Sequence, residues 1–174
     1  MLGHAALGAW SGGRYLHFGE QVDEARLAAL LRPDDVLRTV LTADVYGQGE
    51  GDRLVGRAID GVPREDFALV GAIGHDFYEG ERDGPRGFPR FTDPRLRRPG
   101  EYREYVLTAV EQSLARCGVD RFDVLLLHNP DRRGFESPEV WEALGELRED
   151  GLTGSLGVAP GPANGFTLDL IGCF

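Results

Sequence analysis

Lysine is absent from the sequence, and all 19 of its basic residues are arginines. This absence excludes a Walker-type phosphate loop, which places a lysine on the β- and γ-phosphates. It also excludes Schiff-base aldolases and pyridoxal phosphate enzymes, which use a lysine amine as the nucleophile. The 29 acidic residues give a formal net charge of -10. We therefore expect no nucleic acid and no anionic membrane as a partner, since both require a basic surface. A local phosphate pocket built from arginines stays open.

Cysteines and long apolar runs are also scarce. Cys117 and Cys173 show neither a disulfide framework nor a metal-binding spacing such as Cys-x-x-Cys. The N-terminus lacks the charged and apolar segments of a signal peptide. No apolar stretch approaches the ~20 residues that span a membrane. The sequence therefore predicts a cytoplasmic protein with reduced thiols that acts on a small molecule.

Short apolar runs alternate with helical patterns along the chain, and the length of 174 residues predicts a single domain, residues 1–174. We expect strands at residues 5–10, 35–43, 67–73, 122–127 and 155–158. We expect helices at residues 23–31, 52–60 and 101–117, one starting after Ser137, and the beginning of another at 166–171. Strands that are apolar on both faces and alternate with helices predict a parallel sheet covered on both sides.

The number of strands and helices falls short of a closed barrel. A complete eight-stranded βα barrel takes ~250 residues, whereas this chain ends at Phe174 inside an expected element. We therefore expect a (β/α)8 TIM-type barrel of which the chain covers about the first five strands. An open five-stranded sheet of the flavodoxin type is the alternative. A sheet edge left open by truncation would favour an oligomer.

Residues 74–100 form a connection much longer than the usual 2–6 residues of a βα loop. They carry six arginines, Arg82, Arg86, Arg90, Arg95, Arg97 and Arg98. They also carry Phe77, Tyr78, Phe88 and Phe91, more aromatic residues than a disordered linker would have. In a parallel barrel, this loop leaves the edge where active sites are built. It is expected to be a lid or a wall of the substrate site, and a surface insertion that only packs is the alternative.

Polar side chains follow three of the expected strands. Asp44 and Tyr46 follow the second strand, His75 the third, and His128 and Asn129 the fourth. A tyrosine beside a histidine in a dry pocket forms an acid–base pair that can protonate a carbonyl oxygen. We take Tyr46 and His128 as catalytic candidates, and His75, Asp44 and Asn129 as candidates for substrate binding. A purely structural His128 is the alternative, and a metal site is disfavoured because the spacing follows no known ligand pattern.

The sequence resembles the aldo-keto reductases in the order and spacing of several segments. These are Thr-Ala-Asp-Val-Tyr-Gly at residues 42–47, the helix at 52–60, and residues 113–120, 122–131 and 147–158. The resemblance implies an eight-stranded βα barrel that binds NADP(H) or NAD(H) without a glycine-rich loop. It also implies that Tyr46 donates the proton to a substrate carbonyl and that His128 orients that carbonyl.

The departures from the family pattern fall on its charged and cofactor-binding positions. The motif Asp-Thr-Ala-x-x-Tyr-Gly places the family's aspartate on Leu41, and its lysine falls on Ala72. Losing one partner of a buried ion pair costs ~3–5 kcal/mol, whereas replacing both by apolar residues is often neutral, so the site is remodelled consistently. The family's Ser-Asn after the fifth strand falls on Ala159 and Pro160, which removes two expected partners of the nicotinamide carboxamide.

Three functions follow from these observations. The first is a divergent aldo-keto reductase that reduces an aldehyde or ketone with NAD(P)H, in which His75 or an arginine of the long loop assists Tyr46. The second is a non-redox acid–base enzyme, a lyase, isomerase or hydrolase, that uses Tyr46, His75, His128 and Asp44. The third is a binding module that retains the barrel and has lost the chemistry.

Overall fold

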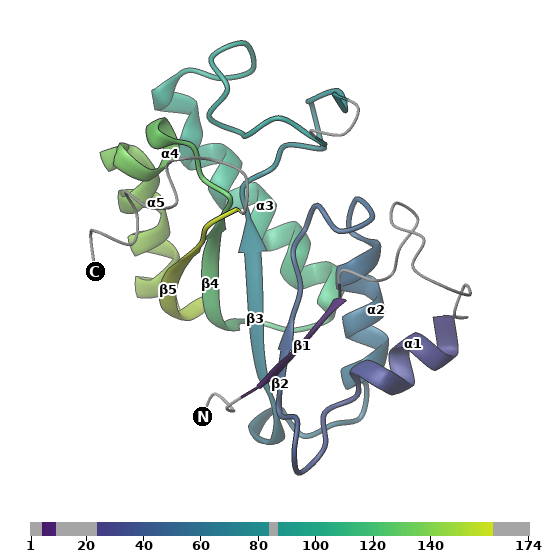
Figure 1. Cartoon of the computed structure of the whole chain (residues 1–174). Helices are drawn as coiled ribbons and strands as arrows, with labels where there is room; N and C mark the ends of the chain where they lie inside the picture. The colour runs from purple at the N-terminus through teal and green to yellow at the C-terminus, as the bar shows by residue number, and fades with distance from the viewer. Residues whose placement is uncertain (1–4, 10–23, 84–86, 162–174) are drawn as a thin grey trace.

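Five parallel strands form one sheet in the order β1-β2-β3-β4-β5. The computed structural model describes residues 5–9, 24–83 and 87–161 (Figure 1). The strands are β1 (Ala6–Gly8), β2 (Thr39–Leu41), β3 (Ala68–Ile73), β4 (Phe122–His128) and β5 (Thr153–Ala159). This strictly sequential order is that of a βα barrel. A flavodoxin-like sheet would instead have the order 2-1-3-4-5, so the open-sheet alternative is wrong.

The connecting helices lie mainly on one side of the sheet (Figure 1). They are α1 (Glu24–Leu31), α2 (Glu50–Ile59), α3 (Tyr102–Cys117), α4 (Arg132–Glu136) and α5 (Pro138–Glu149), with short 3-10 turns η2 (Arg64–Asp66) and η4 (Pro99–Glu101). Helix α3 packs against β3, and α5 packs against both β5 and α3. No helix in the described ranges is long and apolar enough to cross a bilayer.

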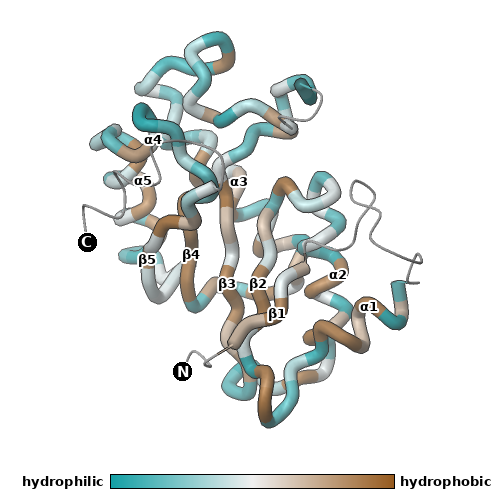
Figure 2. Tube along the Cα trace, in the orientation of Figure 1, coloured by the Kyte–Doolittle hydropathy of each residue, from teal (hydrophilic) through white to brown (hydrophobic). Residues whose placement is uncertain are grey.

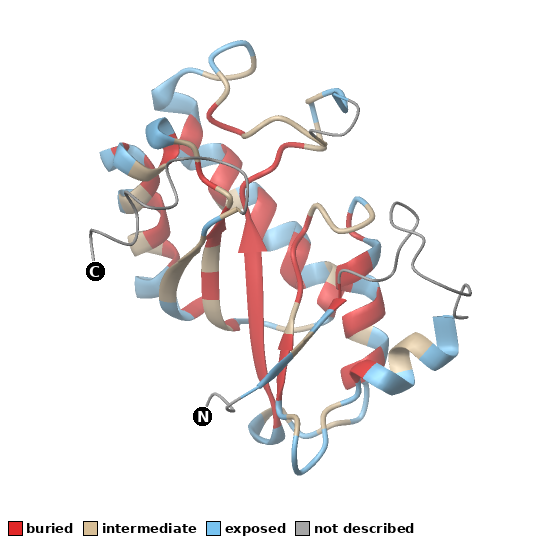
Figure 3. Ribbon diagram, in the orientation of Figure 1, coloured by how far each residue is buried: buried red, intermediate tan, exposed pale blue. Residues whose placement is uncertain are grey.

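The two faces of the sheet differ in how they are covered. All six residues of β3 are buried, as Figure 3 shows along its whole length, and Figure 2 shows apolar residues along β3 and β4. In β4, Leu125 and Leu127 join the core under the helices, whereas Val124 and Leu126 are only partly buried. Within the described residues, helices therefore cover one face and not both as expected. The other face corresponds to the barrel interior, which strands and not helices enclose.

Several predicted boundaries need correction. The strand expected at 35–43 is only Thr39–Leu41 long, because the Asp34 carboxylate accepts hydrogen bonds from the backbone N–H groups of Val36 and Leu37 at 2.8 and 2.7 Å and folds this stretch into a turn. Helix α2 starts at Glu50 and so earlier than expected, and α4 was not predicted. The helix expected at 166–171 lies outside the described residues.

The loop at residues 74–100 folds back on its own base. His75 and Arg90 form an antiparallel bridge, and Phe91 N–H donates to the Gly74 carbonyl at 3.1 Å. The Phe91 ring is buried and stacks on Tyr105 of α3 at a centroid distance of 4.6 Å. The described part of this loop is therefore a packed segment that extends the sheet edge where β3 and β4 end.

Candidate active site

Three of the predicted site residues form a row of rings at the C-terminal edge of the sheet. Tyr46 lies in the turn after β2, His128 ends β4, and His75 follows β3. The ring centroids of Tyr46 and His128 are 5.7 Å apart, and those of His128 and His75 are 5.3 Å apart, both edge to face. Because the strands are parallel, their ends bring together residues that are far apart in the sequence.

His75 is held at both ring nitrogens. Its Nδ1 lies 2.9 Å from the Phe88 carbonyl oxygen, and its Nε2 lies 3.1 Å from the side-chain nitrogen of Asn129. A carbonyl oxygen only accepts, so Nδ1 carries the hydrogen and Nε2 accepts from the Asn129 amide. Burial lowers the pKa of His75 to about 4, with the charge of Arg90 adding to the effect. The ring is therefore neutral at pH 7.

His128 and Tyr46 are likewise uncharged at neutral pH. Burial lowers the pKa of His128 to about 3, with contributions from His75 and Arg90. Its Nδ1 is buried without a hydrogen-bond partner among the described residues. Burial raises the pKa of Tyr46 above its ordinary value. The row thus combines a protonated phenol with two neutral imidazoles, an arrangement that can donate hydrogen bonds to an uncharged carbonyl oxygen.

Asp44 belongs to a different cluster. Its side chain is fully buried, and neither carboxyl oxygen has a hydrogen-bond partner in the described part of the chain. Burial raises its pKa well above the ordinary value, and the charges acting on it come from Asp52, Arg116 and Asp76. The neighbouring Tyr78 has a pKa raised by burial and by Asp44 to about 12. The structure thus groups Asp44 with these buried residues, and its role in substrate binding stays a prediction.

A hydrogen-bond network around Asp52 fixes the turn that carries Tyr46. The Asp52 carboxylate accepts from Thr42 Oγ1 at 2.8 Å, Ser113 Oγ at 2.9 Å and Arg116 Nε at 3.0 Å. Arg116 also donates to the Tyr78 hydroxyl at 3.1 Å. The network joins β2, α2, α3 and the long loop. Sequence analysis missed it because no short-range pattern indicates contacts between residues that are up to 64 positions apart.

The two positions at which the sequence resemblance places the family's aspartate and lysine, Leu41 and Ala72, carry apolar side chains. Leu41 is level with Val70 in the register of β2 and β3. Two residues after Val70, the carbonyl of Ala72 accepts a hydrogen bond from Asp44 N–H at 3.1 Å. Ala72 is buried. Neither Leu41 nor Ala72 can carry charge, so this pair of positions supplies nothing that lowers the pKa of Tyr46.

The end of β5 tests whether a nicotinamide cofactor fits. Ala159 and Pro160 stand there, and their side chains have no group that hydrogen-bonds a carboxamide. The Ala159 carbonyl accepts a hydrogen bond from Asn129 N–H at 2.7 Å. The described residues therefore do not fit this group at that position. No cluster of three potential metal ligands occurs in the described ranges either.

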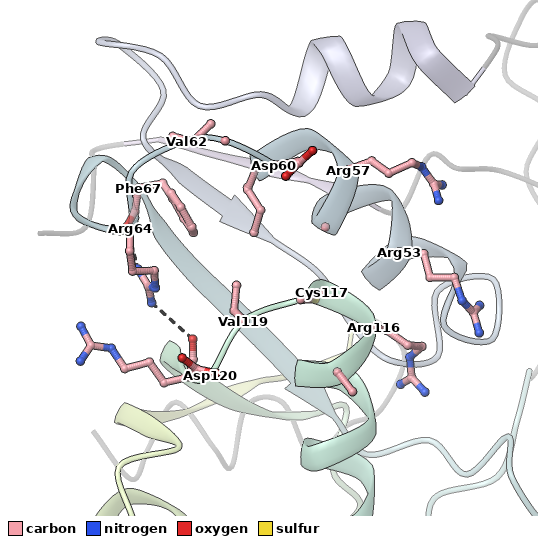
Figure 4. Close-up of a pocket in the computed structure, with 16 residues that line it drawn as sticks. Arg53, Arg57, Asp60, Val62, Arg64, Phe67, Arg116, Cys117, Val119 and Asp120 are labelled. Carbon is pink, nitrogen blue, oxygen red and sulfur yellow. Dashed lines mark hydrogen bonds between the residues drawn. The ribbon is translucent and has the colours of Figure 1, made fainter.

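A pocket of about 820 Å³ lies away from the row, between the C-terminal ends of α2 and α3 (Figure 4). None of the predicted site residues lines it. Arg64 in its wall is paired with Asp123 at 2.7 Å, and Arg116 with Asp52 at 3.0 Å. These two wall arginines hold the fold together and do not point to a second reaction site.

Comparison with known proteins identifies the family. A sequence model of the aldo/keto reductase family matches residues 6–164. The D-threo-aldose 1-dehydrogenase of a Pseudomonas species is 27% identical over 143 residues, which are 78% of this chain and 44% of that protein. Versiconal hemiacetal acetate reductase of Aspergillus parasiticus is 32% identical over 130 residues, 71% of this chain and 36% of that protein.

Solved structures show the same relationship. The holo form of an aldo-keto reductase from Bacillus halodurans superimposes with a TM-score of 0.64 at 27% identity, covering 91% of this chain and 45% of that one. A Klebsiella pneumoniae aldo/keto reductase in complex with NADP and acetate superimposes with a TM-score of 0.60 at 25% identity. The match covers 88% of this chain and 44% of that one. The chain thus spans less than half the length of these relatives. It belongs to the aldo/keto reductase family and contains the first five strands of the family's (β/α)8 barrel.

Proposed function

We propose that the complete protein reduces the carbonyl group of an aldehyde or ketone, and that this chain supplies the edge that binds the carbonyl. The observation that carries the proposal is the edge-to-face contact of Tyr46 with His128, 5.7 Å between centroids, at the ends of β2 and β4. Membership of the aldo/keto reductase family supports it.

The chemistry of the row follows from its protonation. The Tyr46 hydroxyl keeps its proton at neutral pH and donates it to the substrate oxygen as charge develops there. The neutral His128 imidazole orients the carbonyl, and the buried setting strengthens both hydrogen bonds. His75, fixed by Phe88 and Asn129, packs against His128 and holds its ring in place. With no cation in place of Ala72, we expect slower proton transfer than in family members that retain the ion pair.

NADP(H) or NAD(H) is the expected cofactor, and relatives crystallised with NADP and NADPH support this expectation. Because Ala159 and Pro160 offer no side-chain partner for its carboxamide, other groups would have to hold the cofactor.

The poor fit at β5 favours one alternative, a cofactor-free acid–base enzyme. Such a lyase, isomerase or hydrolase would use the same neutral row for proton transfer without a hydride step. It would need His128 or His75 as a base, although burial lowers the pKa of both to about 3 and 4. Weak bases of this kind favour the reductase over the alternative.

The test compares wild type with Tyr46→Phe and His128→Ala. We expect NADPH- or NADH-dependent consumption of small aldehydes, reduced ~100-fold or more in Tyr46→Phe because the general acid is lost, with unchanged cofactor binding by calorimetry. If neither cofactor binds and turnover without cofactor depends on His128, the acid–base alternative is correct. Ligand binding without turnover of any kind, unaffected by Tyr46→Phe, would indicate a binding module.

A further inference from the structure

Arg90 lies beside the ring row and is fixed there by the backbone. It forms the antiparallel bridge with His75, and its Nε donates to the Asn129 carbonyl oxygen at 2.6 Å. Asn129 directly follows His128 and bonds to the His75 ring. The positive charge of Arg90 reaches both rings, where it contributes to the low pKa of His75 and of His128. The guanidinium is therefore part of the same edge as the candidate active site.

No acidic side chain pairs with Arg90 in the described part of the chain. The residue is half-buried, and its Nε is the only guanidinium nitrogen with a described hydrogen bond. Asp131 is the carboxylate whose charge acts on it, but Asp131 Oδ1 already accepts from Gly134 N–H at 2.8 Å and from Thr92 Oγ1 at 3.0 Å. Arg90 is therefore influenced by the charge of Asp131 but forms no described ion pair, although the chain has 29 acidic residues that could have supplied one.

Other arginines of the same loop are paired. Arg97 forms ion pairs with Asp76 and Glu79 and lies over the Tyr105 ring at 4.5 Å. Arg95 pairs with Asp93 at 2.6 Å. Compared with these two, Arg90 has two terminal guanidinium nitrogens without a described hydrogen bond, and its Nε is bound to Asn129 at the edge that carries His75.

We propose that Arg90 binds the carboxylate of the substrate, so that the site accepts oxo acids: compounds carrying an aldehyde or ketone together with a carboxylate. This inference rests on the proposed carbonyl site of Tyr46 and His128. With Nε held by Asn129, the two terminal nitrogens form a fork of fixed orientation, which matches the two oxygens of a carboxylate. The neutral His75 and His128 rings add no competing cation.

The experiment measures binding of benzoylformate and of its methyl ester to the full chain by isothermal titration calorimetry. The two compounds share the ring and ketone and differ in charge. We expect wild type to bind the acid about 10- to 100-fold more tightly, the range for hydrogen bonds to a charged group. In Arg90→Gln the preference disappears while the ester affinity stays the same. Arg95→Gln, which removes an exposed and paired arginine of the same loop, serves as the control and keeps the preference.

If the wild type binds benzoylformate and its methyl ester with equal affinity, the inference is overturned without any variant. A preference for the acid that persists in Arg90→Gln would overturn it as well. Thermal unfolding of each variant shows whether it is folded, and Arg90→Lys, which keeps the charge and loses the fork, is expected to retain part of the preference.

Tyr46→Phe separates this inference from the proposed function. Weaker binding of both compounds supports the carbonyl site. If the acid binds more tightly than the ester and Tyr46→Phe changes neither affinity, Arg90 binds the carboxylate and the carbonyl site is rejected. If Tyr46→Phe weakens ester binding and the acid has no advantage, the carbonyl site is supported and the role of Arg90 is rejected. Absence of binding by either compound rejects both.

Discussion

Burial sets the protonation of the residues at the active edge. The pKa values of His75 and His128 are lowered and that of Tyr46 is raised, and burial is the largest cause in each case. The positions that the resemblance assigns to the family's ion pair hold Leu41 and Ala72, which carry no charge. The proposed proton donation from Tyr46 therefore depends on its buried setting and on the neutral His128.

The stability of the chain should fall between pH 7 and pH 5 because of the two histidines. In the unfolded state they take up protons near pH 6.5, whereas in the folded state their pKa values are about 4 and 3. The stabilisation from neutral, buried rings is thus present above pH 6.5 and is lost as the pH falls. We expect a loss of roughly 2 kcal/mol per histidine over this interval.

Urea denaturation at pH 7 and pH 5 measures this effect. His128→Asn should lose less stability on acidification than wild type, by about the contribution of one histidine. Carboxyl groups titrate in both proteins, so their contribution to the pH dependence of the unfolding free energy cancels in this comparison. Identical pH dependence in the two proteins would mean that His128 is not buried and neutral.

Asp44 predicts the opposite pH dependence. Its folded pKa is raised well above 3.8, so its contribution is favourable below pH 3.8 and is lost as the pH rises toward the folded pKa. Asp44→Asn removes the ionisable group and keeps the shape. We expect the variant to be more stable than wild type at pH 8, by about 1 kcal/mol or more, with the difference vanishing near pH 4. A variant less stable at pH 8 would show that the carboxylate has a partner.

Part of the site could be predicted from single residues and part could not. The closeness of Tyr46, His75 and His128 could be predicted because parallel strands end at one edge, whereas their roles stay predictions. The unpaired state of Arg90 depends on where all other acidic side chains lie, which no local pattern reveals. Asp44 shares the strand-end signal, yet its side chain lies in the cluster with Asp52 and Arg116.

Among the elements, periodicity identified the long helices and strands and failed for the short ones. Helix α4 has five residues, and its start is set by Asp131, whose side chain accepts from Gly134 N–H, a signal too brief to stand out. The strand expected at 35–43 exists as β2 but is shorter than predicted, and the reason is again local. Val36 is apolar but 82% exposed in a turn.

The crossing of α2 and α3 depends on a glycine. A β-carbon at Gly56 would lie 2.9 Å from the Cys117 carbonyl oxygen and 3.0 Å from that of Arg116, whereas one at Gly145 in α5 would meet nothing within 4 Å. Alanine is the better helix former by ~1 kcal/mol. We expect Gly56→Ala to lower the free energy of unfolding by about 1–3 kcal/mol through overpacking.

Gly145→Ala is the matched control in the same assay. It should raise the free energy of unfolding by about 0.5–1 kcal/mol, since only helix propensity changes. Equal effects of the two substitutions in urea denaturation would contradict the close approach of α2 to α3.

At the scale of the whole molecule, the described sheet has a partly exposed apolar face and two open edges, β1 and β5. Leu126 lies on this face, where it packs closely over Gly157 of β5. Half a barrel thus presents surface that the other strands of the family's fold would cover. Such apolar faces favour association.

We expect the isolated chain to be larger than its 19.1 kDa monomer in analytical ultracentrifugation at micromolar concentration. Leu126→Glu should shift it toward the monomer, because a charge on the inner face opposes its burial. Leu30→Glu, which alters a leucine 61% exposed on α1, should leave the distribution unchanged. A monomeric wild type would show that the inner face is already covered.

The two ends of the long loop are tied together, which determines where its sequence and length can be varied. Residues 74–76 are tied to 89–91 by the His75–Arg90 bridge and by backbone hydrogen bonds of 2.8 and 3.1 Å. Insertions near residues 79–83 would therefore lengthen the loop without displacing His75 or Arg90, at an entropic cost of only ~0.6 kcal/mol per doubling of length. The same base could carry many loop sequences, so a combinatorial library at this position would vary the outer wall of the site while leaving its reactive groups untouched.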